Sequence, residues 1–280
     1  MKSNIDSEKI LILDFGSQYT QLIARRIREI GVFSEIVSHR ISLKEIHKLN
    51  PKGIILSGGP ESVYKKNTLK IDPNILNSNI PVLGICYGMQ LIAQHFKGNV
   101  KTSNKSEFGN TQIKIFKGKI FKKINRKELN VWMSHGDKVT KLPKGFKRIA
   151  SSKNCAIAAI ESIKDKKFGL QFHPEVTHTD NGSKILEAFI KDICKCQAKW
   201  RAKNIVKKLV EEIRTKVGDK KVLLGISGGV DSSVAAALLH KAIGKNLECI
   251  FVDNGLLRKD EAKQVKEDLK SALGIKINFS

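Results

Sequence analysis

Four short apolar runs in this sequence each lead into a glycine-containing turn. They are KILILDFG at 9–16, GIILSGGP at 53–60, IPVLGIC at 80–86 and VLLGISGG at 222–229. Runs of this kind, bounded by turn residues, are typical of buried strands in a parallel sheet. Apolar residues at helical spacing between the first two runs, such as Ile23, Ile27 and Ile30, predict crossover helices. The expected fold class is therefore α/β, with an open, mostly parallel sheet flanked by helices.

The pattern changes between residues 100 and 175, where short strands replace most of the helices. The strands predicted there are TQIKIFKG, ELNVWMSHGD, FKRIASSK, CAIAAIES and KFGLQFHPE, the last of which covers residues 167–175. They are expected to form a smaller antiparallel sheet in the same domain. A helix at 181–194 and a basic amphipathic helix at about 198–217 follow, before a second α/β unit begins. We therefore predict two domains, 1–199 and 200–280.

Composition limits the kinds of partner. There is no run of eighteen apolar residues, no secretory signal and no cysteine pattern, which favours a cytoplasmic protein without a membrane partner. The 51 basic and 27 acidic residues give a net charge of +24. Only nine of the basic residues are Arg, and aromatic residues make up 6%. Nucleic-acid readers rely on Arg and on aromatic platforms, so we expect no nucleic-acid partner, although a basic nucleic-acid-binding protein is the alternative.

The sequence GICYG at 84–88 fits the pattern of a nucleophile elbow, with Cys86 in place of serine. The flanking glycines carry no Cβ, so a strand can reverse sharply into a helix and hold the nucleophile at the edge of the sheet. The N-terminus of that helix favours a thiolate. The alternative is an unreactive buried cysteine, because free cysteines are among the most buried residues.

A general base and its orienting carboxylate are predicted in QFHPE at 171–175. In an extended segment His173 and Glu175 project to the same face, and Pro174 between them restricts the backbone. A carboxylate beside the ring sets its tautomer, so His173 can accept the Cys86 proton and later protonate a leaving amine. The alternative is a surface histidine near an unrelated glutamate.

An oxyanion hole requires backbone donors near the nucleophile. The turn SGGP at 57–60 follows another predicted strand and lies at the same edge of the sheet. The amide of Gly59, together with that of Tyr87, can hold an oxyanion. The alternative for SGGP is an ordinary turn.

Together, SGGP, GICYGMQ and QFHPE resemble the motifs of the class I glutamine amidotransferase family, and the resemblance covers about residues 8–196. It implies that Cys86 is the nucleophile, His173 the base and Glu175 its orienter. It also implies that glutamine is held by Gln90, Ser134 and His135.

The segment VLLGISGGVDSS at 222–233 predicts a strand, a glycine-rich loop and a helix whose N-terminus suits a polyphosphate. The alternative is a helix-capping turn. The segment resembles the PP-loop of ATP pyrophosphatases, in which ATP is cleaved between its α and β phosphates. The ATP-binding residues implied are Ser227, Gly228, Gly229, Val230, Asp231, Ser232, Ser233 and Val252. Asp231 is also a candidate ligand for Mg²⁺.

LDFGSQY, WMSHGD and FVDNGLLRKDE are similar to segments of the glutamine-hydrolysing GMP synthetase family. That resemblance implies glutamine, ATP and XMP as substrates: ammonia made from glutamine displaces AMP from adenylated XMP and gives GMP. It implies ATP and Mg²⁺ but no organic prosthetic group, and a homodimer for the full-length member.

The sequence stops at LGIKINFS, about eighty residues into the second domain. We therefore expect either a fragment or a shortened protein that lacks the family's XMP-binding and dimerisation regions. The alternatives are a truncated protein with glutaminase activity alone and a non-catalytic glutamine- or nucleotide-binding module.

Overall fold

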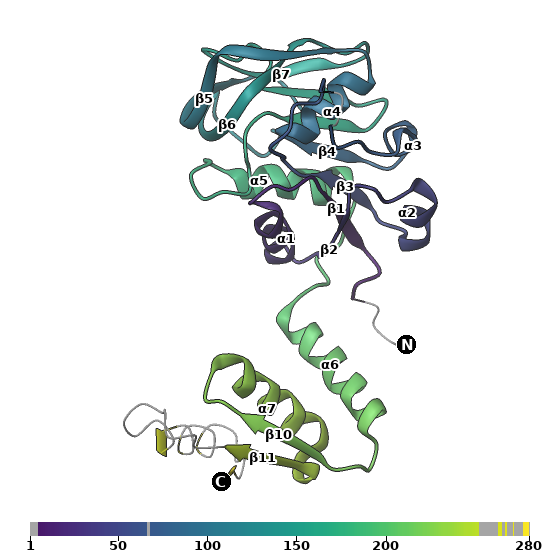
Figure 1. Cartoon of the computed structure of the whole chain (residues 1–280), viewed down its shortest axis with the longest axis vertical. Coiled ribbons are helices and arrows are strands. Elements are labelled where there is room, and N and C mark those ends of the chain that lie inside the picture. The colour runs from purple at the N-terminus through teal and green to yellow at the C-terminus, as the bar shows by residue number, and fades with distance from the viewer. Residues whose placement is uncertain are drawn as a thin grey trace. The chain divides into compact units, whose positions relative to one another are not determined.

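The computed structural model of this protein describes residues 5–65, 68–251, 263–264, 267, 271 and 277–279. The chain divides into two compact units (Figure 1). The N-terminal unit extends to Trp200, and the C-terminal unit begins at Arg201.

The N-terminal unit is built on one nine-stranded sheet with the order β2-β1-β3-β4-β9-β8-β7-β5-β6. Its strands are β1 (Lys9–Asp14), β2 (Phe33–Ser38), β3 (Gly53–Leu56), β4 (Val82–Ile85), β5 (Asn99–Ile115), β6 (Glu128–Lys141), β7 (Lys147–Ser152), β8 (Ala159–Ser162) and β9 (Lys167–Leu170). The strands from β2 to β9 pair in parallel, and those from β9 to β6 pair antiparallel. The predicted fold class is confirmed, and the antiparallel part joins the parallel part through the β9–β8 pairing.

Helices cover both faces of this sheet. They are α1 (Thr20–Glu29), α2 (Leu43–Leu49), α3 (Pro73–Asn77), α4 (Tyr87–His95) and α5 (Gly182–Glu187), which continues as a π-helix over Ala188–Ile193. Successive residues of β1 serve opposite faces, as strand geometry requires. Ile10 packs in the cluster that contains Ile23 of α1, whereas Leu11 packs in the cluster that contains Met89 of α4. The continuous apolar run of β1 is thus buried on both sides.

The strand predicted over residues 167–175 is shorter than expected. β9 ends at Leu170, and residues 171–176 form bends and turns without strand pairing. The prediction that His173 and Glu175 lie in an extended strand is therefore wrong. The physical reason is that Phe172–Glu175 leave the sheet edge to reach β6, where the His173 amide donates to the carbonyl of Trp132 at 3.0 Å.

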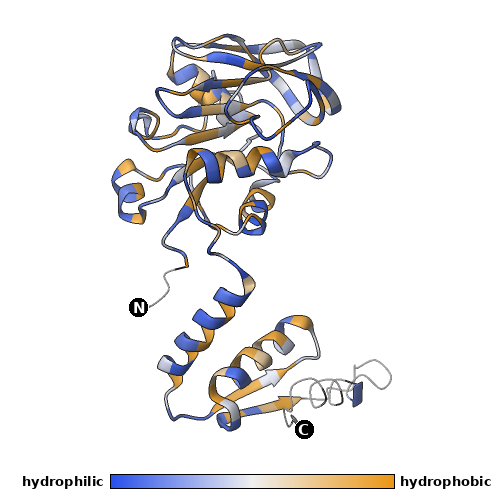
Figure 2. Ribbon diagram, turned by 180° about the vertical axis from the view of Figure 1, so that it is seen from behind, coloured by the Kyte–Doolittle hydropathy of each residue, from blue (hydrophilic) through white to orange (hydrophobic). Residues whose placement is uncertain are grey.

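The C-terminal unit contains three parallel strands in the order β10-β11-β12. Its elements are α6 (Ala202–Val217), β10 (Val222–Ile226), α7 (Val230–Ile243), a 3₁₀ turn (Gly244–Asn246), β11 (Leu247–Phe251) and β12 (Ile277–Phe279). Figure 2 shows hydrophilic and hydrophobic residues alternating along α6, as the sequence predicts for an amphipathic helix.

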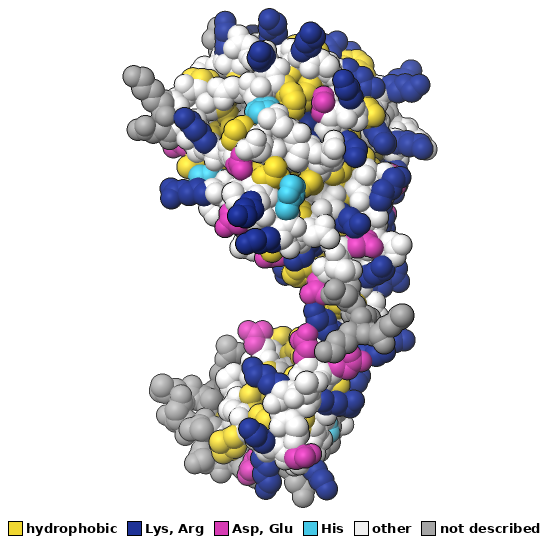
Figure 3. All heavy atoms as spheres, turned by 90° about the vertical axis from the view of Figure 1, so that its right-hand side faces the viewer, with side chains coloured by type: hydrophobic (Ala, Val, Ile, Leu, Met, Phe, Trp, Pro, Cys, Tyr) yellow, Lys and Arg dark blue, Asp and Glu magenta, His cyan; other side chains and the backbone are white. Residues whose placement is uncertain are grey.

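The basic residues do not gather in one place on the face shown in Figure 3. Lys and Arg side chains are spread over that face, with acidic, hydrophobic and neutral side chains between them. None of the described helices combines the length and apolar character needed to cross a membrane.

Gly84→Ala tests the packing of β4 against α4. A Cβ at Gly84 would lie 2.3 Å from the carbonyl carbon of Gly88, whereas a Cβ at Gly136 has Ser106 Oγ at 3.8 Å as its nearest neighbour. We expect Gly84→Ala to lower the free energy of unfolding by about 1–3 kcal/mol, because the clash is with backbone. Gly136→Ala, the control, removes the same backbone freedom from the unfolded chain and should change stability by less than about 0.5 kcal/mol. Urea unfolding of both variants measures this, and equal stabilities would contradict the packing argument.

Candidate active site

Cys86 occupies the turn between β4 and α4 in a backbone conformation that side chains rarely adopt. Its φ is 51° and its ψ is −104°. Such a conformation costs free energy and persists only where the surrounding structure imposes it. The Cys86 amide donates to the Leu170 carbonyl of β9 at 2.7 Å, and a Cβ at Gly88 would lie 2.5 Å from the Leu56 carbonyl oxygen. The strand pairing on one side and the helix on the other therefore fix the turn, as in a nucleophile elbow.

The turn after β9 brings His173 and Glu175 together. His173 Nδ1 lies 2.7 Å from Glu175 Oε1, and both side chains are buried. The His173 carbonyl accepts a hydrogen bond from Thr179 Oγ1 at 2.7 Å, and the ring packs edge-on against Tyr19 at 5.1 Å. The backbone and the ring are thus both held, which leaves the other ring nitrogen available to the nucleophile.

Electrostatics favour a protonated His173. Burial alone lowers the pKa of the ring, but hydrogen bonds to Cys86 and Glu175 outweigh it and raise the pKa to about 10. Cys86 and Glu175 are thus both electrostatic partners of the ring, and Glu175 is joined to it by the hydrogen bond of 2.7 Å. The structure brings the predicted nucleophile, base and orienter into one row.

Two small cavities are both lined by Cys86. One, of about 290 Å³, is lined by the loop at residues 16–19 and by His173. The other, of about 340 Å³, is lined by Tyr87, Gln90 and the segment 134–137. Both cavities share Gly59, Pro60, Cys86 and Ser134. Cys86 is only 6% exposed, so a substrate reaches its sulfur through these cavities rather than from open solvent.

The two predicted oxyanion donors lie at this same place. Tyr87 is the first residue of α4, so its amide has no acceptor within the helix. A Cβ at Gly59 would lie 2.8 Å from the Phe15 carbonyl oxygen, so the turn at 57–60 needs glycine in order to pass so close to β1. Both residues line the second cavity, as the oxyanion-hole hypothesis requires.

The residues predicted to hold glutamine also line the second cavity. The carbonyl of Ser134 accepts from Cys86 Sγ at 3.5 Å. Gln90 is buried, and its Nε2 donates to the Asp137 carbonyl at 2.9 Å, so it also fixes the wall of the cavity. The His135 ring is bonded to Glu107, with Nε2 and Oε2 3.2 Å apart.

Two residues that support the site were not predicted. Gln171 is fully buried, with Nε2 3.6 Å from Cys86 Sγ and Oε1 accepting from Gln90 Nε2 at 3.4 Å. Arg26 of α1 donates from Nε to the Glu175 carbonyl at 2.9 Å, across 149 residues of sequence. The sequence feature that could have pointed to Gln171 is its position in QFHPE, two residues before His173. Nothing in the sequence around Arg26 points to this contact.

The predicted phosphate loop lies in the C-terminal unit, between β10 and α7. Ser227 Oγ lies 3.2 Å from Ser232 Oγ, and Ser233 Oγ donates to the Gly229 carbonyl at 3.0 Å. Gly228 has a φ of 77°, which glycine adopts without strain. Asp231, next to Val230 at the start of the helix, is the acidic residue of the first turn of α7. Val252, the remaining predicted ATP-binding residue, lies outside the described residues.

Comparison with known families agrees with this geometry. Residues 11–193 match the family described as glutamine amidotransferase class-I. The chain belongs to the class-I glutamine amidotransferases. Residues 201–279 match the family described as NAD synthase, and this match begins where the C-terminal unit begins. The predicted order of a class-I amidotransferase domain followed by the start of a PP-loop-like domain is therefore confirmed.

Curated relatives of this amidotransferase carry the name GMP synthase [glutamine-hydrolyzing]. One from Macrococcus caseolyticus is 52% identical over 277 residues, which are 99% of this chain and 54% of the relative. One from Alteromonas mediterranea is 50% identical over an alignment of 285 positions, which covers 99% of this chain and 54% of the relative. The chain thus spans about half the length of the curated relatives it matches.

Two solved structures are each similar to about two thirds or more of the chain. A protein from Thermoplasma acidophilum, described as a putative GMP synthase subunit, is 34% identical with a TM-score of 0.59, covering 67% of this chain and 94% of that one. A glutamine amidotransferase from Thermotoga maritima has a TM-score of 0.51 at 21% identity, covering 72% of this chain and 94% of that one. The second match supports the fold alone.

Arg26→Met tests whether the bond to the Glu175 carbonyl positions the row of catalytic side chains. Its neighbour Arg25 pairs with the same Glu29 but is largely exposed, so Arg25→Met is the matched control. Because a small misplacement of a catalytic group is costly, we expect Arg26→Met to lower the kcat of glutamine hydrolysis about tenfold with little change in KM. Steady-state kinetics of both variants test this, and equal kcat values would contradict the positioning role.

Cys86→Ala and Glu175→Gln are each expected to lower the pKa of His173, because each removes an interaction that raises it. NMR titration of the ring measures the shift, and an unchanged pKa in both variants would contradict the interaction of the ring with these two side chains. A His173 pKa that folding raises from 6.5 to about 10 adds to the free energy of unfolding, and this contribution is complete below pH 6.5. That contribution should disappear as the pH rises through the folded-state value.

Proposed function

We propose that the N-terminal unit hydrolyses glutamine, with Cys86 as nucleophile, His173 as general base and acid, and Glu175 as the orienting carboxylate. The observation that carries this proposal is the row of buried side chains at the elbow, in which Nδ1 of His173 lies 2.7 Å from Oε1 of Glu175. A cysteine that served only in packing would not need a strained backbone, an imidazole partner and two cavities that it lines.

The geometry supports a two-step mechanism. With His173 already protonated, Cys86 Sγ attacks as the thiolate at the carbon of the glutamine side-chain amide, and the amides of Gly59 and Tyr87 stabilise the oxyanion. His173 then gives its proton to the leaving nitrogen, so ammonia departs and a glutamyl thioester remains. Water attacks the thioester with the now neutral His173 as base, which releases glutamate and restores the thiolate beside protonated His173. In this scheme Gln90 and the Ser134–His135 backbone hold the amino acid part of glutamine.

We further infer that the ammonia serves GMP synthesis from XMP. The support is the relatives' name, their identity of 52% over nearly this whole chain, and the phosphate loop that follows the amidotransferase unit. In this proposal ATP adenylates XMP, ammonia displaces AMP, and GMP and pyrophosphate are released. Water exclusion keeps ammonia unprotonated and nucleophilic during transfer.

The loop at the start of α7 fits a polyphosphate in its residue types. Gly228 and Gly229 carry no side chains over the loop at the N-terminus of a fourteen-residue helix, where anions are favoured, and the Gly229 amide donates to Ser227 Oγ at 3.4 Å. Ser227, Ser232 and Ser233 add hydroxyl groups. Asp231 would hold Mg²⁺, which neutralises phosphate charge when it is bound. A homodimer remains a prediction for a chain of the relatives' full length.

Cys86→Ala distinguishes an active glutaminase from a non-catalytic glutamine-binding module. We expect this substitution to reduce glutamate release at least about a thousandfold, because the nucleophile of a catalytic triad has no substitute. Cys196→Ala removes another buried thiol of the same unit, near Glu8 and Lys52 and away from both cavities, and should leave the rate unchanged. A native chain that binds glutamine but releases no glutamate would favour the binding module.

Asp231→Asn tests the division of labour between the units. In a fusion of this chain with the C-terminal half of the Macrococcus caseolyticus relative, we expect the substitution to abolish pyrophosphate release and spare glutamate release. Asp219→Asn makes the same charge change before β10, outside the loop, and is the control. If both activities fell together in Asp231→Asn, the assignment of ATP chemistry to the C-terminal unit would be wrong.

A further inference from the structure

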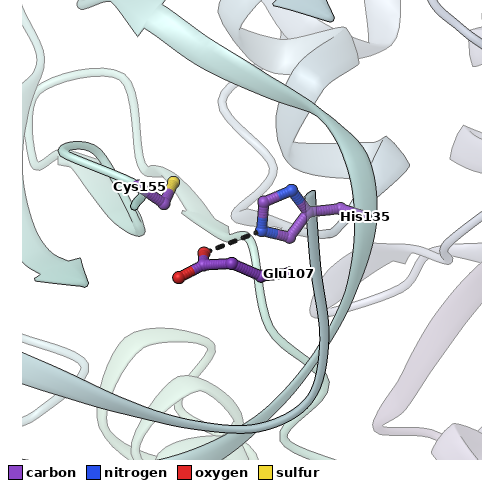
Figure 4. A group of neighbouring side chains, drawn as sticks. All are labelled: Glu107, His135 and Cys155. Carbon is purple, nitrogen blue, oxygen red and sulfur yellow. Dashed lines mark hydrogen bonds and ion pairs between the residues drawn. The ribbon is translucent and has the colours of Figure 1, made fainter. Parts of the chain in front are cut away.

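A second cluster of reactive side chains lies behind the wall of the glutamine-side cavity. Glu107 comes from β5, His135 from β6 and Cys155 from the loop between β7 and β8, and Figure 4 shows the three side chains converging. One ligand atom from each residue lies within 4.8 Å of the other two, and all three residues are buried. None of these side chains takes part in the hydrolysis described above.

Hydrogen bonds hold the three groups in place. Glu107 Oε2 lies 3.2 Å from His135 Nε2, and Glu107 Oε1 accepts from Ser152 Oγ at 2.6 Å. The Cys155 amide donates to the same Ser152 Oγ at 2.8 Å, and Cys155 Sγ is 3.3 Å from the Ile157 carbonyl. Backbone from three neighbouring strands and one loop therefore positions the cluster, as a ligand site requires.

The cluster buries a carboxyl group without a bonded cation. Glu107 is 4% exposed, and among the described residues it has no ion pair with Lys or Arg. Burial lowers the pKa of His135, although the Glu107 carboxylate opposes this. Burial and the Glu107 carboxylate raise the pKa of Cys155 to about 12, and Lys138, whose ammonium group donates to the Asn154 carbonyl, lowers it only in part. A bound cation would balance the negative charge of a carboxylate buried in this way.

We propose that Glu107, His135 and Cys155 bind a divalent transition metal ion, with Zn²⁺ as the best match. One oxygen, one imidazole nitrogen and one sulfur are a ligand set that suits zinc, with a fourth position for water. Ligand atoms around tetrahedral zinc lie about 3.3–3.8 Å apart, given bond lengths of about 2.0–2.3 Å. The cluster therefore needs side-chain shifts of about an ångström or less.

Binding has a simple proton balance. The Cys155 thiol releases its proton to solvent and forms the metal–sulfur bond. In the free chain the Nε2–H of His135 faces Glu107 Oε2. On binding, Nε2 loses this proton to solvent and Nδ1 takes one up, so Nε2 binds through its lone pair and the proton sits on Nδ1, an atom without a hydrogen-bond partner among the described residues. Glu107 gives one oxygen and exchanges its bond to His135 for a bond to the metal, while Ser152 stays on the other oxygen.

The metal has a path to this site. Glu107 lines a surface cavity of about 760 Å³ together with Ser151, Ser152, Lys153 and Asn154. His135 lines the glutamine-side cavity on the other side. A bound ion would therefore brace the segment 134–137 against β5 and the loop before β8, which raises the stability of the folded unit.

The test uses the purified chain with Cys86→Ala, which removes the thiol at the elbow as a competing ligand. Titration with Co²⁺, followed by its thiolate-to-metal absorption band, and with Zn²⁺, followed by calorimetry, is expected to give one site per chain. Adding Cys155→Ser should abolish the band and weaken Zn²⁺ binding at least about tenfold. Adding Cys249→Ser, which removes a buried thiol from the C-terminal unit, should change neither.

Glu107→Gln keeps the shape of the side chain and provides a second test if Cys155→Ser does not fold, as circular dichroism would show. It is expected to weaken Zn²⁺ binding at least about tenfold. The proposal is overturned if no cobalt–thiolate band forms, if the band persists in Cys155→Ser, or if Glu107→Gln binds Zn²⁺ as tightly as its parent. Any of these results would leave Glu107, His135 and Cys155 as a hydrogen-bonded network only.

Discussion

The close approach of α4 to β4 is the constraint on which the site depends. Gly84 of β4 lets the backbone of α4 lie against its own strand, and Gly88 of α4 lets the helix lie against Leu56 of β3, at distances that any Cβ would prevent. Cys86, between them, is forced to a φ of 51°. The free-energy cost of that conformation is met by packing and strand pairing around it. The result is a thiol at the end of a strand and at the start of a helix, where an incoming substrate and backbone donors can both reach it.

The pairing of β4 with β9 supplies the second half of the site. It places Leu170, the last residue of β9, beside Cys86, so the chain that leaves β9 must pass the nucleophile. His173 and Glu175 follow within that turn. Residues from the antiparallel strands then complete the site, because the Trp132 carbonyl holds the His173 amide and the Ser134 carbonyl faces Cys86. The antiparallel part of the sheet therefore contributes to the site as well as to the fold.

Much of this was predictable because the signals are local. The elbow follows from GICYG, and the base with its carboxylate follows from two residues separated by one proline. The expected cause was wrong, however: His173 and Glu175 do not meet because side chains alternate along a strand. A turn brings His173 Nδ1 to 2.7 Å from Glu175 Oε1. The contacts of Arg26, Glu107 and Cys155 could not be predicted from short motifs. Arg26 is 149 residues from its partner Glu175, and Glu107 is 28 residues from its partner His135. Which of these distant residues meet depends on the order of strands in the sheet. The order β9-β8-β7-β5-β6 is not encoded in any short pattern of residues.

The central claim is that Cys86 forms a covalent intermediate with glutamine. The most direct measurement is mass spectrometry of the chain after rapid acid quenching of a reaction with saturating glutamine. The account predicts a glutamyl thioester on the peptide that contains Cys86, and its accumulation at the expense of free thiol. Release of glutamate at the native rate while the Cys86 peptide stays unmodified, or a glutamyl group on another cysteine, would contradict it.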